Sequence, residues 1–429
     1  MEVKNKLTKT IVTIARIVFG ITFIFSGFVK AVDPLGFTYK IEDYLISFQL
    51  TQLIPFALAF SITLILIEFV LGVFILIGIY RKWTSLLAVL FMLVMTPLTL
   101  YIALENPVKD CGCFGDALII SNWSTFYKNI VLLVSAIVLF VYRKQIMPLY
   151  SSKTKSYVLA FVVLFFLAFS FYNIIYLPVL DFRPYKVGSN IPEKMGHNMM
   201  QGDVYENIYV YEKEGVTKEF TDENYPWEDT TWTFVELKSN LIEEGDKPEI
   251  QDFAITAYHK NENGTFNKAD DITHEFLSKP FSLLIVSLSL NEIGDTQWQK
   301  IQSIADYAAN NSIDMRIGTS SDENVIEQLD RNMRDANLNY ASMDELTLKT
   351  IIRSNPGLLL LKEGVVKAKW SKNRLPDVSQ LNNIISNYHI INEEHLPNNK
   401  TDSKLLIICL LFAIPLLGLK WYDKKSLNT

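Results

Sequence analysis

Long apolar runs constrain the fold of this 429-residue chain more than any other feature of its sequence. Five of these runs lie before residue 181, and a sixth, shorter one lies near the C-terminus. Each approaches or exceeds the roughly 17 residues that a helix needs to cross the hydrocarbon core of a bilayer. The sequence therefore predicts six membrane spans, at about 10–31, 53–79, 84–104, 125–142, 157–180 and 404–419.

Lysine and arginine are distributed unevenly over the segments between these spans. Twelve of them lie in the terminal segments and in the loops on the same side of the membrane, whereas the two short loops on the other side carry only Lys40 and Lys109. Because short cytoplasmic loops are enriched in Lys and Arg, we expect both termini to be cytoplasmic. Residues 181–403 would then lie outside, together with Cys111 and Cys113.

Charge divides the chain in the same way. Residues 1–180 and 404–429 together carry a net charge of +9, whereas residues 181–403 carry −15, which gives the overall charge of −6. The acidic part argues against nucleic-acid binding, which needs a clustered basic face. Three cysteines are too few for a secreted scaffold held together by disulfides. A membrane protein with a large acidic outer region is the class that remains.

The acidic region begins with β-rich segments and continues as alternating strands and helices. Residues 205–220 read as a hairpin around a Gly turn, and residues 248–273 read as a second one around Asn263-Gly264. The alternation that follows predicts a βα-type sheet. Its segments are a strand at 281–290, a helix at 298–312, a strand at 313–320, a helix at 322–335 and two strands within 348–370.

This order, with Pro356 just before the penultimate strand, resembles the thioredoxin-like fold of membrane-tethered periplasmic thiol-disulfide proteins. The resemblance covers about 248–390, and SNPGLLLLKEGVVKAKW is its best marker. In that family the proline is usually cis and lines the groove that binds clients, so the resemblance gives Pro356 this role. The alternative is a plain βα domain in which Pro356 merely ends a loop.

One departure from the thioredoxin-like pattern changes the expected role of this domain. The family's CxxC pair would follow the first core strand, where this chain reads SLSLNEIGD. No cysteine occurs between Cys113 and Cys409. The domain is therefore expected to bind or dock a partner rather than to exchange thiols itself.

The loop KDCGCFGDALIISNWSTFYKN (109–129) carries the chemistry that the outer domain lacks. Cys111 and Cys113 flank Gly112, and cysteines at i and i+2 can close a tight ring because glycine tolerates strained dihedral angles. A disulfide in such a ring departs from relaxed geometry and is readily reduced, which is typical of exchanging rather than structural bonds.

The first four spans and the CGCFG loop resemble the DoxX/MauE family of small, redox-associated membrane proteins with four helices. The resemblance covers about 10–145. The matching residues are Arg16, Gly20, Ser26, Gly27, Lys30, Asp33, Pro34, Glu68, Gly72, Cys111, Cys113 and Asn129. With the outer thioredoxin-like region, the whole chain resembles multi-domain DoxX proteins of the Bacteroidetes type. This resemblance implies a bacterial inner membrane and a periplasmic outer domain.

Relatives of the MauE type imply a role in disulfide formation in a periplasmic dehydrogenase during methylamine utilisation. The chain gives no independent sign of that substrate. For Cys111 and Cys113 three interpretations stay open: a redox-active pair, an inert link or two idle thiols, and a metal site. The metal site fits worst, because zinc takes four ligands and all five histidines lie in the outer region. Cys409, in the last span, is expected to be a packing residue.

Arg16 and Glu68 are ionisable residues inside spans, where such groups are costly and often functional. We expect them to pair across a helix interface. The pair would either fix helix packing or serve a proton- or quinone-related role. Lys30, near the outer boundary, is expected to extend toward the membrane surface, with Asp33 as its partner.

The sequence thus predicts an all-α membrane bundle of six spans joined to an α/β thioredoxin-like domain. We expect a component of thiol-disulfide exchange that acts on an extracytoplasmic client through Cys111 and Cys113. Its electron partner would be a bilayer quinone or a separate thioredoxin-like oxidoreductase, and no other cofactor is indicated. A non-enzymatic scaffold is the alternative, and a small-molecule transporter is weaker because no inverted repeat is visible.

The expected segments are 1–150, a four-helix domain with the CGC loop; 151–185, the fifth span and a linker; 186–247, a β-rich segment; 248–395, the thioredoxin-like domain; and 396–429, the last span and tail.

Overall fold

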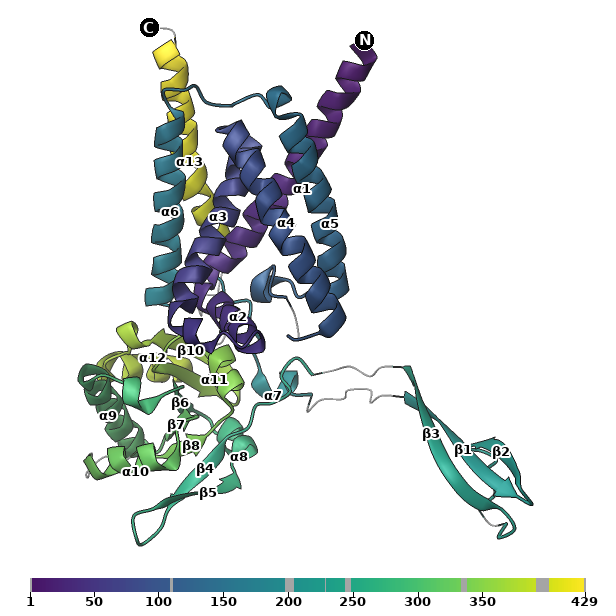
Figure 1. Ribbon diagram of the computed structural model, residues 1–429. Coiled ribbons are helices and arrows are strands. Elements are labelled where there is room, and N and C mark those ends of the chain that lie inside the picture. The colour runs from purple at the N-terminus through teal and green to yellow at the C-terminus, as the bar shows by residue number, and fades with distance from the viewer. Residues whose placement is uncertain are drawn as a thin grey trace.

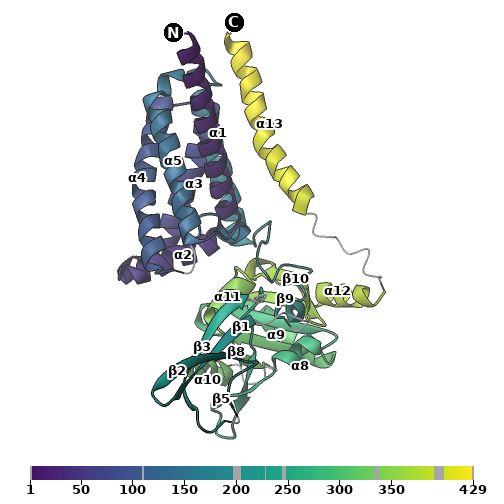
Figure 2. The same ribbon diagram turned by 90° about the vertical axis from the view of Figure 1, so that its right-hand side faces the viewer.

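Six long apolar helices form the membrane part of the chain in the computed structural model (Figure 1), and all six are long and apolar enough to cross a bilayer. They are α1 (Glu2–Val32), α3 (Ala57–Ile77), α4 (Arg81–Glu105), α5 (Asn122–Val141), α6 (Lys155–Ile175) and α13 (Thr401–Leu427). Both chain ends lie at the same end of the bundle (Figures 1 and 2). The structure describes residues 2–108, 111–196, 204–227, 229–243, 248–332, 338–390 and 401–427. Lys109, His197 and His395 lie outside these ranges.

The predicted spans are confirmed as helices, but their bounds differ. The fifth ends at Ile175 rather than near residue 180, because Pro178 follows and a proline disfavours helical geometry in the residue before it. Helix α13 is longer than the predicted 404–419 and extends at both ends.

Helices α1 and α3 approach each other closely through glycines. A Cβ atom on Gly27 would lie 2.8 Å from the Cβ of Phe69, and one on Gly72 would lie 2.7 Å from the backbone nitrogen of Ile24. Small residues at a membrane-helix interface permit such a short distance between backbones. This contact brings the polar residues of α1 and α3 together.

The segment after α1, expected to be a loop, forms a helix instead. Helix α2 (Pro34–Ser47) begins after Asp33, whose side chain accepts a hydrogen bond from the backbone nitrogen of Gly36 at 2.9 Å. Asp at the N-cap and Pro in the first turn are the residues that favour a helix start. Helix α2 lies across the end of the bundle that faces the α/β domain, and the 3-10 turn η1 (Thr51–Phe56) follows it (Figure 1).

Beyond α6 the chain forms two sheets. A three-stranded antiparallel sheet of order β2-β1-β3 projects away from the rest of the molecule (Figure 1). Its strands are β1 (Val204–Lys213), β2 (Val216–Thr221) and β3 (Thr233–Glu243). The predicted hairpin at 205–220 is confirmed, and β3 is an additional strand that the sequence analysis did not predict.

The α/β domain is built on a seven-stranded sheet of order β10-β9-β6-β7-β8-β4-β5. The β6–β7 and β7–β8 pairs are parallel, and the other neighbouring pairs are antiparallel. The strands are β4 (Thr256–Lys260), β5 (Phe266–Asp271), β6 (Ser282–Ser287), β7 (Asp314–Thr319), β8 (Tyr340–Ser342), β9 (Gly357–Lys362) and β10 (Val365–Ser371).

Strand β6 separates two apolar layers, because its side chains alternate between the faces of the sheet. Leu283 and Ile285 join the layer that contains residues of α9, whereas Leu284 joins the layer that contains Leu348 of α11. A helical membrane part and an α/β domain therefore make up the chain, in agreement with the predicted fold class. The shorter helices are α7 (Ile191–Lys194), α8 (Thr273–Ser278), α9 (Asp295–Asn310), α10 (Glu323–Asn332), α11 (Glu345–Ile351) and α12 (Val378–Ile390).

Candidate functional site

Cys111 and Cys113 lie in the loop between α4 and α5, outside the helices, and both are free thiols. Their side chains are within hydrogen-bond contact of each other. Cys111 is buried, with 7% of its surface exposed, and packs against Ile102 and Val108. Cys113 is partly exposed. The two thiols therefore touch, but they differ in their access to solvent.

The backbone of both cysteines is anchored to the helices beneath the loop. The Ser26 hydroxyl of α1 lies 2.6 Å from the carbonyl oxygen of Cys113, to which it can donate. The Tyr44 hydroxyl of α2 donates to the carbonyl oxygen of Cys111 at 3.0 Å. The loop is thus held by one residue of α1 and one of α2.

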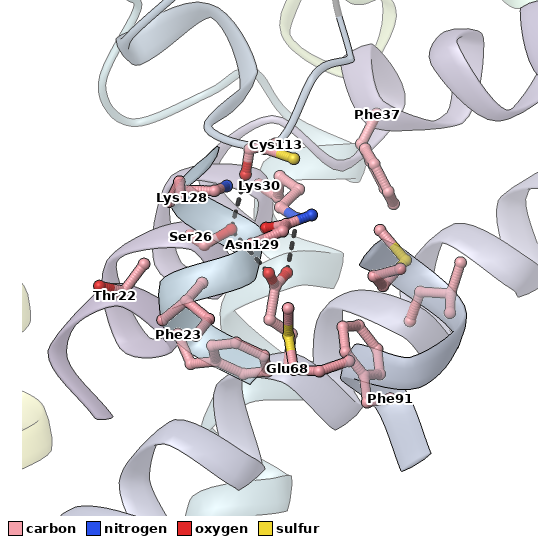
Figure 3. A pocket seen from close by; sticks show the side chains of 14 residues that line it. Thr22, Phe23, Ser26, Lys30, Phe37, Glu68, Phe91, Cys113, Lys128 and Asn129 are labelled. Carbon is pink, nitrogen blue, oxygen red and sulfur yellow. Dashed lines mark hydrogen bonds and ion pairs between the residues drawn. The ribbon is translucent and has the colours of Figure 1, made fainter. Parts of the chain in front are cut away.

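A buried ion pair lies directly below this anchor (Figure 3). The Lys30 Nζ is 2.5 Å from the Glu68 Oε2, and the two residues are 6% and 9% exposed. The Ser26 hydroxyl is also 2.7 Å from the Glu68 Oε1. Ser26 therefore lies between the ion pair and the backbone of Cys113, and its single hydroxyl hydrogen is available to either acceptor.

The expected pair of Arg16 and Glu68 is not formed. Helices α1 and α3 are antiparallel, and Lys30, fourteen residues beyond Arg16 and hence roughly 21 Å further along the helix, is level with Glu68. Arg16 instead donates to the carbonyl oxygens of Ile75 and Leu76, at 2.8 Å and 2.5 Å. These acceptors belong to the last turn of α3, whose carbonyls lack partners within the helix.

The expectation for Lys30 is wrong as well. Its ammonium group is buried against Glu68 rather than extended to the membrane surface, because the close approach of α1 and α3 brings a carboxylate within its reach. Asp33, its expected partner, binds Arg353 instead.

A small pocket of about 50 Å³ lies between the ion pair and Cys113. Of the described residues that line it, three are charged: Lys30, Glu68 and Lys128. The ammonium group of Lys128 also lies 4.4 Å from the centre of the Phe114 ring. Figure 3 shows Lys128 and Cys113 at the same end of the pocket, above Glu68.

The two thiols have opposite pKa shifts. The hydrogen bond from Cys111 lowers the pKa of Cys113 to about 6 against the effect of its burial, and the charges of Lys128 and Lys30 lower it further. The same hydrogen bond, together with burial, raises the pKa of Cys111. Cys113 is thus the thiol that ionises first, and the proton that remains lies on Cys111.

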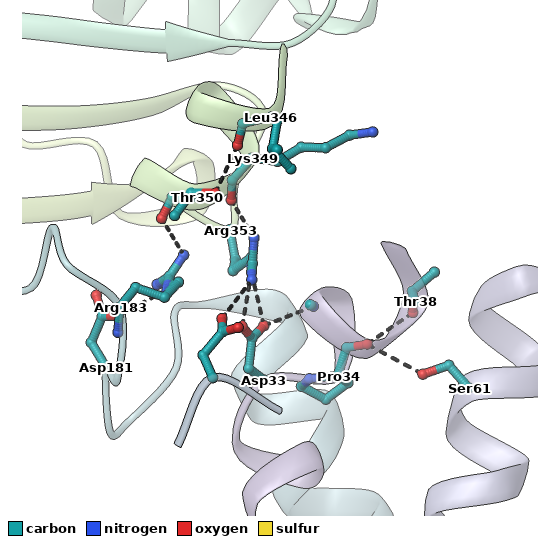
Figure 4. Close-up of polar contacts among 12 residues, drawn as sticks. Asp33, Pro34, Thr38, Ser61, Asp181, Arg183, Leu346, Lys349, Thr350 and Arg353 are labelled. Atoms are coloured by element: carbon teal, nitrogen blue, oxygen red, sulfur yellow. Dashed lines mark hydrogen bonds and ion pairs between the residues drawn. The ribbon is translucent and has the colours of Figure 1, made fainter. Parts of the chain in front are cut away.

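The α/β domain contacts the CGC loop through Arg353, between α11 and β9 (Figure 4). The Arg353 guanidinium is 2.8 Å from Asp33, at the end of α1, and 3.1 Å from Asp116, which lies three residues after Cys113. Arg353 is only 6% exposed, and it also donates to the carbonyl oxygen of Lys349. The α/β domain is therefore docked directly on the loop that carries the cysteines. Arg353 could not be identified from the sequence, because no local pattern distinguishes it from a surface arginine.

A second charged cluster ties the linker after α6 to the same domain. Asp181 binds Arg183 at 2.9 Å and Lys369 of β10 at 2.8 Å. Burial lowers the pKa of Lys369 to about 8, and the neighbouring charge of Arg183 acts in the same direction. Arg183 also donates to the carbonyl oxygen of Thr350, one turn before Arg353 (Figure 4).

Pro356 follows a cis peptide bond and is buried. The neighbouring Asn355 amide donates to the carbonyl oxygen of Ser289 at 3.1 Å and to the Glu292 carboxylate at 3.0 Å, and it accepts from the Ser287 hydroxyl at 2.7 Å. The cis-proline loop is thus tied to the segment where a CxxC pair was expected and is absent.

Comparison with known families gives two matches. Residues 8–142 match the family model described as methylamine utilisation protein MauE, and residues 205–244 match a model described as a domain of unknown function. No curated protein and no solved structure matches the chain. The first match covers most of α1 and all of α2 to α5. It therefore includes the CGC loop and also Lys30, Glu68 and Lys128, which lie in the helices.

Proposed function

Since residues 8–142 match the family model of the MauE membrane proteins, we propose that this protein exchanges thiols and disulfides with an extracytoplasmic client through Cys111 and Cys113. One observation carries the proposal: two free thiols that pack together lie outside the helices, one of them partly exposed, and their contact lowers the pKa of Cys113. A thiolate rather than a thiol is the nucleophile in exchange, so a lowered pKa increases the reactive fraction at neutral pH.

The exchange needs only this pair and a client disulfide. A thiolate of the pair attacks one client sulfur, the client S–S bond breaks, and the first client thiolate leaves. The second thiol of the pair then displaces the other client sulfur and gives its proton to a client thiolate. The client gains two electrons and one proton from the pair and takes its second proton from the solvent, while Cys111 and Cys113 form a disulfide. The reverse sequence oxidises a client dithiol.

For the electron partner we propose a protein thiol-disulfide oxidoreductase rather than a quinone. The pocket below Cys113 is about 50 Å³, which suits one or two water molecules and is too small for a quinone ring. A protein partner would instead reach Cys113 from its partly exposed side.

The α/β domain is proposed to be thioredoxin-like. The parallel β6–β7 pair with α9 between its strands, the antiparallel β9 beside β6, and the cis peptide bond at Pro356 support this assignment. Because the domain has no cysteine, its proposed role is to hold the CGC loop through Arg353 and to present a docking surface for a client.

The proposed orientation puts both termini in the cytoplasm and the α/β domain in the periplasm. The excess of Lys and Arg on the side of the termini supports it. The CGC loop and the α/β domain lie at the opposite end of the bundle from the termini (Figure 1), as this orientation needs.

Thiol trapping in intact cells tests the function and the orientation together. A membrane-impermeant maleimide is expected to label Cys113 after treatment with a reductant and not after oxidation, whereas the buried Cys111 is labelled only once the reduced protein is denatured. One of the two single Cys→Ser variants is expected to capture a client as a mixed disulfide, because the resolving thiol is gone. Cys409→Ser serves as the control, since this residue lies in α13.

A scaffold with inert cysteines is the competing function. The anchors from Ser26, Tyr44 and Arg353 favour it, because a structural loop would be fixed in the same way. Thiols that stay in one redox state under all conditions, with no phenotype in the Cys→Ser variants, would support the scaffold and exclude the exchange.

A further inference from the structure

We infer that Lys128 makes Cys113 the attacking thiol of the pair and leaves Cys111 as the resolving thiol. The assignment of roles rests on the proposed exchange. The underlying claim, that Lys128 stabilises a thiolate at Cys113, concerns the charges of the pocket and can be tested without any client.

Access distinguishes the two cysteines first. Cys113 is partly exposed and lines the pocket, so it is the more accessible of the two cysteines to a client. Cys111 is buried among Ile102, Val108 and Tyr44, and its thiol is in contact with the sulfur of Cys113. This is the position of a resolving thiol, which needs to reach only Cys113.

The charges of the pocket distinguish them further. Lys30 and Glu68 are 2.5 Å apart and neutralise each other. In the described part of the chain Lys128 has no ion-pair partner, and its ammonium group is held over the Phe114 ring beside Cys113. The described lining therefore carries one uncompensated positive charge, which a thiolate on Cys113 would balance.

Among the described residues, the other elements around the loop add no compensating charge to this pocket. Helix α4 contributes Phe91, Met92 and Met95 to its lining. Lys40 of α2 packs its aliphatic stem against Gly112 and does not line the pocket, and Asp116 is bound by Arg353. The lowered pKa of Cys113, to which Lys128 contributes, agrees with this charge count.

In the exchange itself the Cys113 thiolate would attack a client disulfide and form the mixed disulfide, releasing one client thiolate. The Cys111 thiol would then attack the Cys113 sulfur of the mixed disulfide. This breaks the bond to the client, forms the Cys111–Cys113 disulfide, and passes the Cys111 proton to a client thiolate.

The charge claim is tested on the full-length protein in detergent, with Cys111→Ser and Cys409→Ser as background so that Cys113 is the only thiol. The rate of alkylation by iodoacetamide is measured against pH. We expect Lys128→Met to raise the pH midpoint by about one unit and Lys128→Glu to raise it further, because a nearby cation favours the thiolate. Lys128→Arg is expected to retain the midpoint, since it keeps the charge.

Lys40→Met and Lys40→Glu are the matched controls, because Lys40 touches the loop but does not face the pocket. They are expected to leave the midpoint in place. If the pH midpoint shifts in a graded way at position 128 and not at position 40, the shift reports the charge of the side chain. A loosened loop would not make the midpoint follow the sign of that charge. Equal midpoints for the arginine, methionine and glutamate variants at 128 would overturn the inference.

The role assignment has its own readout. Cys111→Ser is expected to accumulate a mixed disulfide with a client through Cys113, and Cys113→Ser is not. Capture by Cys113→Ser alone would overturn the assignment of roles and leave the exchange itself intact. The absence of any captured client, combined with the graded shift at Lys128, would contradict the proposed function but not the charge claim.

Discussion

At the scale of single residues, Gly112 and Gly115 shape the CGC loop, since both have positive φ angles, of 66° and 53°. A residue with a side chain pays about 1–2 kcal/mol for this left-handed conformation. A Cβ on Gly112 would also lie 3.2 Å from the Lys40 Cγ, whereas one on Gly115 would meet nothing within 4 Å. A side chain at Gly115 would therefore cause backbone strain only, whereas one at Gly112 would cause the same strain and also crowd Lys40.

We expect Gly112→Ala and Gly115→Ala each to reduce the free energy of unfolding by about 1 kcal/mol, measured by thermal unfolding in detergent. Gly112→Ala alone is expected to change the alkylation rate of Cys113, because this residue lies between the cysteines and against Lys40. An unchanged rate in Gly112→Ala, or an equal change in Gly115→Ala, would contradict the claim that Gly112 sets the relative position of the thiols.

Residue types were predictable at this scale, but their partners were not. A CGC motif outside the membrane and ionisable residues within the spans can be recognised from composition and spacing alone. The partner of each residue depends on how far one helix is shifted along its axis relative to its neighbour, and no local sequence pattern encodes this shift. For this reason Glu68 was assigned to Arg16, while the structure pairs it with Lys30.

At the scale of elements, the contact between α1 and α3 positions the polar residues below Cys113. Ser26 and Lys30 of α1 reach Glu68 of α3 because Gly20, Gly27 and Gly72 allow the two backbones to approach. A side chain at Gly27 would meet Phe69 at 2.8 Å. The geometry of the loop anchor therefore depends on residues that never touch the loop.

We expect Gly27→Ala to destabilise the protein by about 1–3 kcal/mol, because the added methyl overpacks a tight interface. Thermal unfolding in detergent measures the loss. Gly418→Ala in α13 is the control: its Cβ would meet nothing within 4 Å, and alanine favours a helix over glycine, so this variant is expected to be neutral or slightly more stable. A Gly27→Ala variant as stable as the control would show that the interface can relax.

Helices and strands with strong periodicity were predictable, whereas elements defined by their surroundings were not. The spans and the buried strand β6 follow from runs of apolar residues. Helix α2 was missed because it is short and lies across the end of the bundle, where no continuous apolar run marks it. Strand β3 is mostly exposed, so its pattern does not distinguish it from a loop.

At the scale of the whole molecule, the α/β domain is tied to the membrane part at several points. Arg353 binds Asp33 and Asp116, and Asn373 donates to the carbonyl oxygen of Ile175 at the end of α6. At the other end of the bundle the membrane part is tied to itself: Asp423 of α13 accepts hydrogen bonds from Ser151 and Thr154, just before α6. These contacts join segments more than 100 residues apart, so their positions could not be read from local sequence.

The contacts of Arg353 predict that the adjoining part of the α/β domain and the CGC loop open together. Arg353→Met leaves Asp33 and Asp116 without their shared cation, and the unpaired charge is costly at Asp33, whose side chain is largely buried. We therefore expect faster amide hydrogen exchange both in residues 349–357 and in residues 111–118, while β6 and the membrane helices keep their protection.

Arg331→Met, a change at an exposed arginine of α10, is the matched control and is expected to leave both segments unchanged. Faster exchange confined to residues 349–357 would mean that the loop is held by Ser26 and Tyr44 alone, and the proposed coupling of the two parts would be lost. Opening of both segments would instead mean that a domain without cysteines controls the mobility of the chain's cysteine pair. A client that displaces Arg353 from Asp116 would then loosen the loop that holds Cys113.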